Sequence, residues 1–465
     1  MSANNSGNTF TGGISVEQGT LQIASINNAA TNGVLGNNTS IGLGTISQTA
    51  TLEYTGSTAL SNMPFTLAGA GSGAFQIDSA ATNLTLTGAI GGNGTLVKSG
   101  SGTLTLGGNN TFTGGVTINA GTLLLGSAGA LNSTAANAVA FGPSSTGVLG
   151  LNGLSVTVSG LNTDPMTGTP VVQDGNLAGA ILTVNNATAN TFAGVLRDGP
   201  GGGALSLIKS GAGTLTLSGS NNFTGATTVA GGTLNTADSG TLATGALTIS
   251  TTNGVASVVN LGDNQTVSSL SGTLGGNVPT LSIASGVTLT DNQSSGNTLF
   301  PGLLIINSSG AFIKSGSSSL ELNGAPTLNA NGGLQVNGGT MRFNIFIGGE
   351  ATVGAGVRAT VSSGATLELA GSVSALSSGA NRVNITNSSS SPGLLVSGTH
   401  QQVGNIDGSG TTQVNAGSDL TANHIVQSAL VIGGAAGSPA LVTIDASDAS
   451  GNPLASRVDL PWLAR

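Results

Sequence analysis

The stretch Leu96–Leu125, LVKSGSGTLTLGGNNTFTGGVTINAGTLLL, returns further along the chain as a near copy. In the second copy, LIKSGAGTLTLSGSNNFTGATTVAGGTL, Lys209 takes the place of Lys98. A third and more divergent copy, FIKSGSSSLELNG, starts at Phe312, and Asn8–Ile23 holds only the second half of a copy. Repetition on this scale is typical of a chain that stacks similar units.

Leucine and threonine alternate inside the repeat. Leu104 and Leu106 share one face of a strand, and Thr103 and Thr105 take the other. The Gly, Asn and Ser residues between such runs adopt positive φ or bond their own backbone, so they predict turns. No stretch combines an apolar period of 3.6 with helix caps. The sequence therefore predicts an all-β chain with few or no helices.

The composition favours an ordered chain over a disordered one. Charged residues make up 6% of the 465 residues and aromatic residues 3%, while 78 residues are glycine. Disordered chains usually combine low hydrophobicity with high net charge, whereas the mean hydropathy here is +0.27. We expect an elongated parallel β-solenoid of about 20 coils of roughly 20 to 25 residues, stacked at ~4.8 Å. Leu, Val and Ile would face inward, and Thr, Ser and Asn outward.

The repeats predict the domain organisation. Residues 1–445 are expected to form one continuous β-solenoid, with repeat copies at 8–23, 96–125, 207–236 and 312–343. Residues 446–465, which hold the single Trp462, are expected to form an irregular C-terminal tail or cap. The segment Leu161–Asn176 contains two prolines and predicts a loop that bulges from the scaffold. The serine-rich tract Asn387–Ser391 is a candidate linker.

Charge and cysteine content exclude several classes of function. The formal net charge is −8, and nine basic residues are spread along the chain, so no cationic groove for nucleic acid is expected. Without cysteine there is no disulfide, thiolate metal site or cysteine nucleophile. The most apolar uncharged stretch, Ser428–Ile444, is shorter than the ~20 apolar residues that cross a bilayer, so it predicts strands rather than a membrane span.

The three lysines of the protein, Lys98, Lys209 and Lys314, occupy one position of the repeat, and Ser-Gly follows each. One interpretation is a ladder of cations that binds anions. The other, which we favour, is a solvated lysine that blunts edge pairing at a turn.

Two further residue types recur in the repeat. Asn110 and Asn222 are predicted to lie in turn ladders, in which stacked side chains satisfy one another's amides. The signature Asn-x-Phe-x-Gly places Phe10, Phe112 and Phe223 at one position, and the same signature surrounds Phe192. These phenylalanines are predicted to fill the core or a turn.

The pattern KSGxGTLTLxGxNxFTGxxxVxxGTL resembles the autotransporter-associated β-strand repeat, also called the passenger-associated transport repeat. Lys98–Leu123 and Lys209–Leu234 match it almost throughout, and Asn8–Leu21 matches its latter half. Phe312–Met341 departs from it by losing a glycine, a threonine and the N-x-F-T-G segment. The resemblance implies a right-handed parallel β-helix passenger, secreted or displayed at the cell surface, whose repeats assist transport across the outer membrane.

The two ends of the sequence bear on this resemblance. Met1–Asn5 contains neither the basic nor the apolar region of a secretory signal. Gly398–Ile444 resembles the C-terminal region of exported repeat proteins that end in a sorting signal, but neither amphipathic barrel strands nor the apolar span of such a signal follows. We therefore expect a fragment of a longer passenger.

Candidate catalytic residues are sparse. Asn162–Asp164 matches one short polygalacturonase motif, but the paired aspartates, the His-centred motif and the Arg/Lys motif that accompany it are missing. Glycoside hydrolysis needs a second carboxylate across the bond. His400 and His424 lie far apart in the sequence without clustered ligands, so each is expected to be a lone surface or turn histidine. We predict no catalytic and no cofactor-binding residues.

Four polar residues near the C-terminus, Asp445, Asp448, Asn452 and Asp459, suggest calcium at first sight. Their spacing fits neither the EF-hand register nor the glycine-rich nonapeptide repeat, and calcium requires six or more converging oxygens. We expect solvated loop residues there and no metal site.

Two functional hypotheses follow. The first is a non-enzymatic passenger, a monomeric rod that acts as a stalk or adhesin and contacts surface glycans or proteins of other cells. The alternative is a carbohydrate-active β-helix, similar to a polysaccharide lyase or hydrolase, with a site in a loop such as Asp164–Asp174. Carboxylates lining one groove would favour the enzyme, and an even Ser/Thr/Asn surface would favour the stalk.

Overall fold

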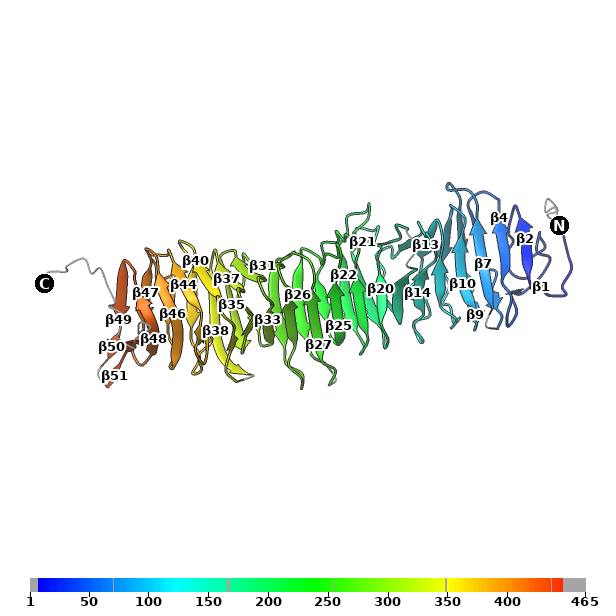
Figure 1. The fold of residues 1–465 in the computed structure, drawn as a ribbon. Helices are drawn as coiled ribbons and strands as arrows, with labels where there is room; N and C mark the ends of the chain where they lie inside the picture. The colour runs from blue at the N-terminus through cyan, green and yellow to red at the C-terminus, as the bar shows by residue number, and fades with distance from the viewer. Residues whose placement is uncertain are drawn as a thin grey trace. The chain divides into compact units, whose positions relative to one another are not determined.

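The computed structural model describes residues 7–445, except residues 70, 165–167, 253, 348 and 436 and the side chains of residues 346 and 347. The chain divides into two compact units, Met1–Gly225 and Ala226–Arg465, which are described in turn. No described residue lies in a helix, so the all-β prediction is confirmed. In Figure 1 the strands of each unit run side by side as ladders.

The first unit contains strands β1 to β23, grouped here by their order in each sheet. The first sheet consists of β1 (Ile14–Val16), β3 (Ile41–Leu43), β6 (Phe65–Leu67) and β9 (Ile90–Gly92). The second consists of β17 (Gly160–Thr163), β14 (Ala138–Phe141), β12 (Val116–Ile118), β10 (Thr95–Ser99), β7 (Ser72–Ile77), β4 (Ala50–Tyr54) and β2 (Gly19–Ile23). The third consists of β21 (Val195–Arg197), β18 (Val171–Gln173), β15 (Val148–Gly150), β13 (Thr122–Leu125), β11 (Thr103–Leu106), β8 (Asn83–Leu86) and β5 (Ala59–Ser61). The remaining strands are β16 (Val156–Val158), β19 (Ala180–Asn185), β22 (Leu205–Ser210), β20 (Asn190–Phe192) and β23 (Thr214–Leu217).

The second unit contains strands β24 to β52. One set of neighbours is β24 (Thr227–Val229), β26 (Ala246–Ser250) and β29 (Ser269–Thr273), and another is β25 (Gly232–Thr236), β27 (Ser257–Leu261), β30 (Thr280–Ile283), β33 (Leu303–Ile306), β36 (Thr327–Leu328) and β39 (Thr352–Val353). A nine-stranded sheet consists of β28 (Gln265–Val267), β31 (Thr288–Asn292), β34 (Ala311–Ser315), β37 (Gly333–Val336), β40 (Arg358–Val361), β44 (Asn384–Asn387), β46 (Gln401–Asp407), β48 (Asp419–Ile425) and β52 (Leu441–Ile444). A seven-stranded sheet consists of β32 (Thr298–Phe300), β35 (Ser319–Gly324), β38 (Thr340–Ile347), β41 (Thr366–Leu369), β45 (Leu394–Val396), β47 (Thr411–Val414) and β49 (Ala429–Ile432). Two small antiparallel hairpins join β42 (Ser377–Ser378) to β43 (Asn381–Arg382) and β50 (Gly434–Ala435) to β51 (Ser438–Pro439).

Parallel pairing between successive coils gives each unit its core. In the first unit Leu104 of β11 pairs in register with Leu84 and with Leu123, and Leu123 pairs with Leu149. All four leucines are fully buried. Like residues therefore stack from coil to coil inside the unit, which confirms the predicted parallel β-solenoid and its leucine-rich interior.

The register also shows that coils differ in length. The coil from Leu104 to its partner Leu123 is shorter than the next one, from Leu123 to Leu149. The first falls just below the predicted length of a coil, and the second just above it. The extra residues lie in the turns, because the register of the strands themselves is unbroken across these pairs.

The second unit repeats this arrangement with different residues. Leu289 of β31 pairs with Phe312 of β34, which pairs with Leu334 of β37. All three side chains are buried. The aromatic ring takes a position that leucine occupies on either side, so the core accommodates residues of different size at one position of the coil.

Two predicted irregular segments prove to belong to the coils. In Leu161–Asn176, predicted to bulge as a loop, the residues up to Thr163 belong to β17 and Val171–Gln173 form β18, with Leu161 and Val172 fully buried, and the described residues between these strands are irregular. In the tract Asn387–Ser391, predicted as a candidate linker, Asn387 and Ser389 are also fully buried. The loop prediction was therefore wrong for the two strands, and the linker prediction was wrong because the core holds Asn387 and Ser389 on its inward face.

The asparagine prediction needs correction. Asn110 Oδ1 accepts from the backbone N–H of Ile90 at 2.8 Å, and its Nδ2 donates to the carbonyl of Ala130 at 2.7 Å. Asn110 thus bonds to the main chain of neighbouring coils and not to a stacked amide. Its counterpart in the second copy is the buried Asn221, since Asn222 is exposed.

The phenylalanine prediction is confirmed for three of its four residues. Phe112, Phe192 and Phe223 are buried in the core. Phe10 is 39% exposed, and its ring lies beside Gly36, where a Cβ would collide with it. Two other expectations were tested as well: Ser428–Ile444 contains strands as predicted, and among the described residues no helix is long and apolar enough to cross a membrane. The tail 446–465 lies outside the described residues.

Candidate functional site

The lysine of each repeat lies at a corner of the coil, at or near the end of a strand. In the first copy Lys98 is the fourth residue of β10 and is fully buried. Its Nζ donates to the carbonyl oxygens of Ser99 at 2.7 Å, of Gly100 at 2.9 Å and, in the next coil, of Ala120 at 3.1 Å. All three donors of the ammonium are thereby used inside the protein.

The Ser-Gly that follows each lysine makes this corner possible. Gly100 has φ of +72°, and its equivalents Gly211 and Gly316 have +74° and +77°. A Cβ on Gly100 would lie 2.3 Å from the carbonyl oxygen of Ile77 in the coil before. The glycine therefore turns its carbonyl toward the lysine while the chain passes close to its neighbour.

The prediction that these lysines are solvated was wrong. Lys98, Lys209 and Lys314 are all fully buried. The Nζ of Lys209 donates to Ser210 and Gly211, and that of Lys314 donates to Ser315 and Gly316. The alternative of an anion-binding ladder is equally unsupported, because these ammonium groups are turned toward carbonyls of the protein. The sequence signal for this burial is the alternation itself, since Lys98 lies two residues after Leu96 and shares its inward face.

Burial changes the acid–base properties of these lysines. It lowers the pKa of Lys98 to about 8 and that of Lys209 to about 8, because the charged form loses its hydration. The carbonyl oxygens around each Nζ act in the opposite direction, since they accept best from a charged donor.

The third copy adds a carboxyl group to the corner. Asp291 of β31 pairs in register with Lys314 of β34, and both side chains are fully buried. Burial raises the pKa of Asp291 to about 7, although the positive charge of Lys314 opposes the rise. Burial also lowers the pKa of Lys314, opposed by Asp291. The corners are internal, so they support the scaffold and do not present a site.

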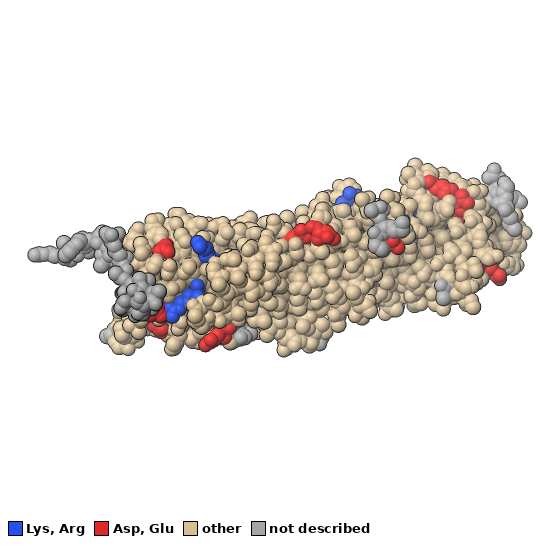
Figure 2. Space-filling view, in the orientation of Figure 1, with Lys and Arg blue, Asp and Glu red and all other residues tan. Residues whose placement is uncertain are grey.

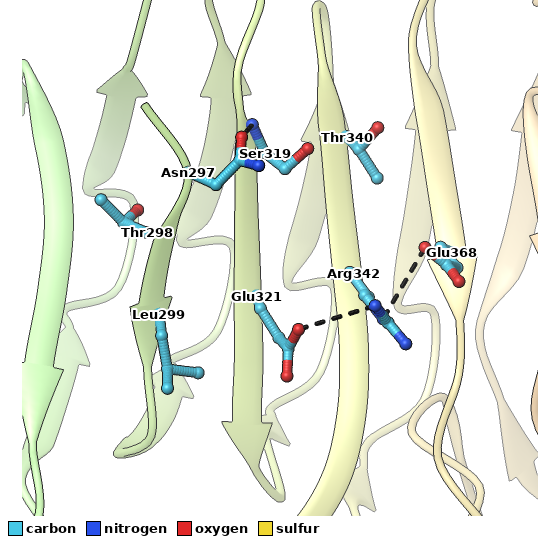
Figure 3. A pocket seen from close by; sticks show the side chains of 8 residues that line it. All are labelled: Asn297, Thr298, Leu299, Ser319, Glu321, Thr340, Arg342 and Glu368. Carbon is cyan, nitrogen blue, oxygen red and sulfur yellow. Dashed lines mark hydrogen bonds and ion pairs between the residues drawn. The ribbon is translucent and has the colours of Figure 1, made fainter. Parts of the chain in front are cut away.

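A surface site is formed instead on the outer face of the seven-stranded sheet of the second unit. A hollow of about 400 Å³ opens over β32, β35, β38 and β41. Its lining residues come from four successive coils and are shown in Figure 3: Asn297, Thr298, Leu299, Ser319, Glu321, Thr340, Arg342 and Glu368.

A row of charged side chains crosses the floor of this hollow. Parallel register places Glu321 of β35 beside Arg342 of β38, and Arg342 beside Glu368 of β41. Arg342 Nη1 lies 3.7 Å from Glu321 Oε2, and Arg342 Nε lies 3.7 Å from Glu368 Oε2 (Figure 3). Leu299 of β32 pairs with Glu321 and extends the row with an apolar side chain that is 42% exposed.

The two carboxylates are held by other donors as well. Asn344 Nδ2 donates to Glu321 Oε1 at 3.0 Å, and Ser397 Oγ donates to Glu368 Oε1 at 2.6 Å. The guanidinium is less well satisfied, because both of its ion pairs are longer than a hydrogen bond and Nε has no hydrogen-bond partner among the described residues. Nε itself is buried, so the donors that the partly exposed guanidinium offers to the hollow are those of its Nη atoms, beside carboxylates whose positions are fixed.

Hydrolytic chemistry does not fit this row. A glycosidase needs two carboxyl groups in different roles with the scissile bond between them. Here Arg342 fills the space between Glu321 and Glu368 and forms an ion pair with each. Both carboxylates thus serve the same guanidinium.

The two aspartates that bound the loop of the alternative hypothesis, Asp164 and Asp174, have different surroundings. Asp174 is fully buried, and its Oδ1 accepts from the backbone N–H of Gly153 at 2.6 Å. Asp164 follows the end of β17, where its backbone N–H donates to Phe141. The intervening residues 165–167 lie outside the described part of the chain. The two aspartates are therefore not exposed together on one surface.

The two histidines lie apart, as predicted. His400 is exposed in the turn before β46, and its backbone N–H donates to Asp419 at 2.8 Å. His424 of β48 lies 2.7 Å from Asp407 through Nε2 and Oδ1. No triad is formed by either contact.

Of the four polar residues near the C-terminus that suggest calcium, the structure describes only Asp445. Arg382 forms two bonds to Asp445, of 2.7 and 2.8 Å, and hydrogen bonding to this guanidinium lowers the pKa of Asp445. Asp445 is thus tied to β43 and is not simply a solvated loop residue. Asp448, Asn452 and Asp459 lie outside the described residues. Within the described part of the chain no three His, Cys, Asp or Glu side chains are grouped to hold a metal ion.

No prediction from the sequence included the charged row, although the sequence contains a pattern that indicates it. Aligning the strands SLEL, TMRF and TLEL, which start at Ser319, Thr340 and Thr366, places Glu, Arg and Glu at one position of three successive coils. In a chain with 6% charged residues this coincidence is unusual. Figure 2 shows how widely charged side chains are scattered over the face in view.

Comparison with known proteins identifies the repeat. Four segments match the family model of the passenger-associated transport repeat, at residues 4–23, 96–125, 207–235 and 312–342. The adhesin BmaC autotransporter of Brucella suis biovar 1 (strain 1330) is 31% identical over 229 residues. That alignment covers 48% of this chain and 6% of the relative, so the chain spans a small part of that protein's length. No solved structure matches the chain. The chain therefore carries passenger-associated transport repeats and is similar, over about half its length, to an autotransporter adhesin.

Proposed function

We propose that this chain is part of a non-enzymatic passenger that is secreted or displayed at the bacterial surface and acts as an adhesin-like stalk. The observation that carries the proposal is the match of four segments to a repeat found in transported passengers. The similarity to an autotransporter adhesin supports the same function. In this proposal the repeats assist transport across the outer membrane, and the outer faces of the coils contact glycans or proteins of other cells.

The architecture is consistent with a scaffold rather than with a catalyst. The buried lysines donate to main-chain carbonyls at corners of the coils, as with Lys98 and its three carbonyl partners. In the charged hollow over β35, β38 and β41 both carboxylates form ion pairs with one guanidinium, an arrangement that does not give them the two different roles of a glycosidase pair. A stalk requires a repetitive scaffold and no catalytic groups, because it holds a binding surface away from the cell.

Surface labelling tests the proposed location. Antibodies raised against the purified chain should label intact native cells, or detect the protein in the medium, and external protease should remove the label. Detection only after lysis would contradict surface display. An inner cytoplasmic protein serves as the control for intact cells.

A binding assay tests the proposed activity. Beads coated with the purified chain should be retained on layers of epithelial cells more than beads coated with albumin. The same preparation should release no reducing ends or unsaturated sugars from pectin or other plant and animal polysaccharides. Release of such products would favour the enzyme, and equal retention of both bead types would contradict an adhesin.

A further inference from the structure

The hollow of the second unit combines three chemical features in one row. Leu299 provides an exposed apolar surface, Arg342 provides donors, and Glu321 and Glu368 provide acceptors on either side. Parallel strands are about 4.8 Å apart, so three steps from Leu299 to Glu368 span ~14 Å. A volume of about 400 Å³ lies within the range of small-molecule sites.

We propose that this hollow binds an uncharged sugar unit of a glycan, with neighbouring hydroxyl groups seated between Arg342 and the flanking glutamates. The inference rests on the proposed adhesin function and names the class of ligand for one of its surfaces.

The donors and acceptors of the hollow favour a polyol as the ligand. A guanidinium only donates and an ionised carboxylate only accepts, whereas a hydroxyl does both. One hydroxyl can therefore accept from Arg342 and donate to Glu321, and its neighbour can do the same with Glu368. The long 3.7 Å separations in both ion pairs leave the guanidinium free to turn its donors toward such oxygens.

The charge and shape of the hollow restrict the class of ligand further, to an uncharged sugar. The row carries two negative charges and one positive charge, so an anionic sugar would meet net repulsion at the glutamates. The carbon face of a pyranose is apolar and can lie on Leu299, whose side chain is 42% exposed. The adjacent row adds the hydroxyl residues Ser319 and Thr340, which lie in register on β35 and β38.

The first experiment is a glycan array that holds neutral oligosaccharides beside sialylated and uronic-acid forms of the same chains. The purified full chain should bind at least one neutral glycan, and its acidic form more weakly. Binding of acidic glycans alone, or of none, would overturn the proposal.

Calorimetry with the best neutral glycan then locates the site. Arg342→Lys keeps the positive charge between the glutamates but loses the planar fork of donors. We expect it to weaken binding about tenfold or more, since a hydrogen bond to a charged group is lost. Arg358→Lys is the matched control, because Arg358 is an exposed arginine of β40 in the same unit, and its affinity should stay within about twofold.

A second pair of variants guards against misfolding. Leu299→Ala should weaken binding by about threefold while the exposed position leaves the fold intact. Leu274→Ala removes another exposed leucine of this unit, outside the hollow, and should leave binding unchanged. Equal affinity of Arg342→Lys, Leu299→Ala and the unaltered chain would overturn the site.

The two proposals fail in distinguishable ways. If beads coated with Arg342→Lys adhere to cells as well as the unaltered chain, and glycan affinity is also unchanged, the hollow is not the site and the adhesin proposal stands. If the unaltered chain is confined to the cell interior, the proposed function fails even where the hollow binds a neutral glycan in calorimetry.

Discussion

A buried ammonium group is stabilised differently at the corner of Lys98 in the first unit and at the corner of Lys314 in the second. Lys98 stacks between Phe75 and Ile118 in the core, and three carbonyls receive its ammonium. Lys314 stacks between Asp291 and Val336. Among the described residues it donates to two carbonyls, at 2.5 and 3.4 Å.

The difference shows what a buried cation requires. An ammonium without hydration must be satisfied by hydrogen bonds or by an opposite charge. The first corner relies on carbonyls from two coils, whereas in the second the negative charge of Asp291, in the coil before, acts on Lys314 without a hydrogen bond to it. The turn that supplies the third carbonyl in the first copy, at Ala120, has Gly338 in the third copy. The same motif can therefore retain its lysine although its surroundings change.

The largest expected effect is that of Lys98→Met. Methionine fills the volume of the stem but leaves three carbonyl oxygens without their donor, which costs about 3 kcal/mol of unfolding free energy in this region. Local hydrogen exchange of peptides from Leu96–Leu125 in the full chain measures the loss. The control is Val97→Met on the outward face of the same strand, which should change exchange little. Unchanged protection in Lys98→Met would break the comparison, because it would mean that the carbonyls do not need the lysine.

The next effect is that of Lys314→Met, which should be smaller than that of Lys98→Met at pH 5 and about equal to it at pH 8. At pH 5 the variant loses two carbonyl contacts, about 2 kcal/mol. At pH 8 it should lose about 1 kcal/mol more, because Asp291, with its pKa raised to about 7, then lacks the neighbouring positive charge. Hydrogen exchange at both pH values measures this, with rates corrected for intrinsic exchange.

The double variant Asp291→Asn/Lys314→Met provides the control for that prediction. The double variant should not show the additional loss of unfolding free energy that Lys314→Met shows at pH 8. A cost that is equal at both pH values in the single variant would show that Asp291 does not respond to Lys314.

Asp291 alone should give the second unit a pH dependence between pH 3.8 and about 7, whereas the lowered pKa of Lys98 makes the first corner depend on pH only above about 8. Its folded pKa of about 7 exceeds the ordinary value of 3.8, so between these values the folded state binds more protons than the unfolded state. The contribution to stability is therefore complete below pH 3.8 and is lost as pH rises through about 7, at up to about 1.4 kcal/mol per pH unit.

Asp291→Val, which copies Val184 beside Lys209, should remove this slope, about 2 kcal/mol between pH 5 and 6.5. The free energy of unfolding is measured by denaturant titration at each pH. Hydrogen exchange of peptides from β31 and β34 is the readout. A slope that persists in the variant would assign it to another group.

The smallest effect sharpens the comparison at Ala120. Ala120→Gly gives the first corner the Asn-Gly-Gly turn of the third copy. We expect a loss of about 0.5 kcal/mol through the greater freedom of the unfolded chain, with Lys98 still bonded to the carbonyl of residue 120. A loss as large as that of Lys98→Met would mean that the side chain at this turn, and not the lysine, holds the corner.

The sequence predicted the scaffold well because alternation is a local property. Leu104 and Leu106 lie on the inward face as the Thr-Leu pattern requires, and the stacking of Leu104 on Leu84 and Leu123 follows once coils are in register. The prediction for Lys98 was wrong because the same alternation places it inward, where three carbonyl oxygens replace the water that lysine usually prefers. Its inward position could have been inferred from Leu96, which lies on the same face of the strand.

The candidate site was harder to predict, because it depends on register between coils of unequal length. The coil from Glu321 to Arg342 is shorter than the coil from Arg342 to Glu368. Turns of different length absorb that difference, and their conformation is not evident from composition. Asp174 shows the opposite limit, since a polar residue in a segment predicted as a loop lies fully buried and bonded to the backbone.

Amine labelling tests the central claim most directly, because the protein has only three lysines and all are assigned to buried corners. The folded chain would be treated with an N-hydroxysuccinimide ester at pH 7.5, with and without denaturant, and mapped by peptide mass spectrometry. Lowered pKa values make these amines more reactive wherever reagent can reach them, so slow reaction reports burial. We predict that Lys98, Lys209 and Lys314 react only in denaturant. Rapid modification of the three lysines in the folded chain would contradict the buried-corner account.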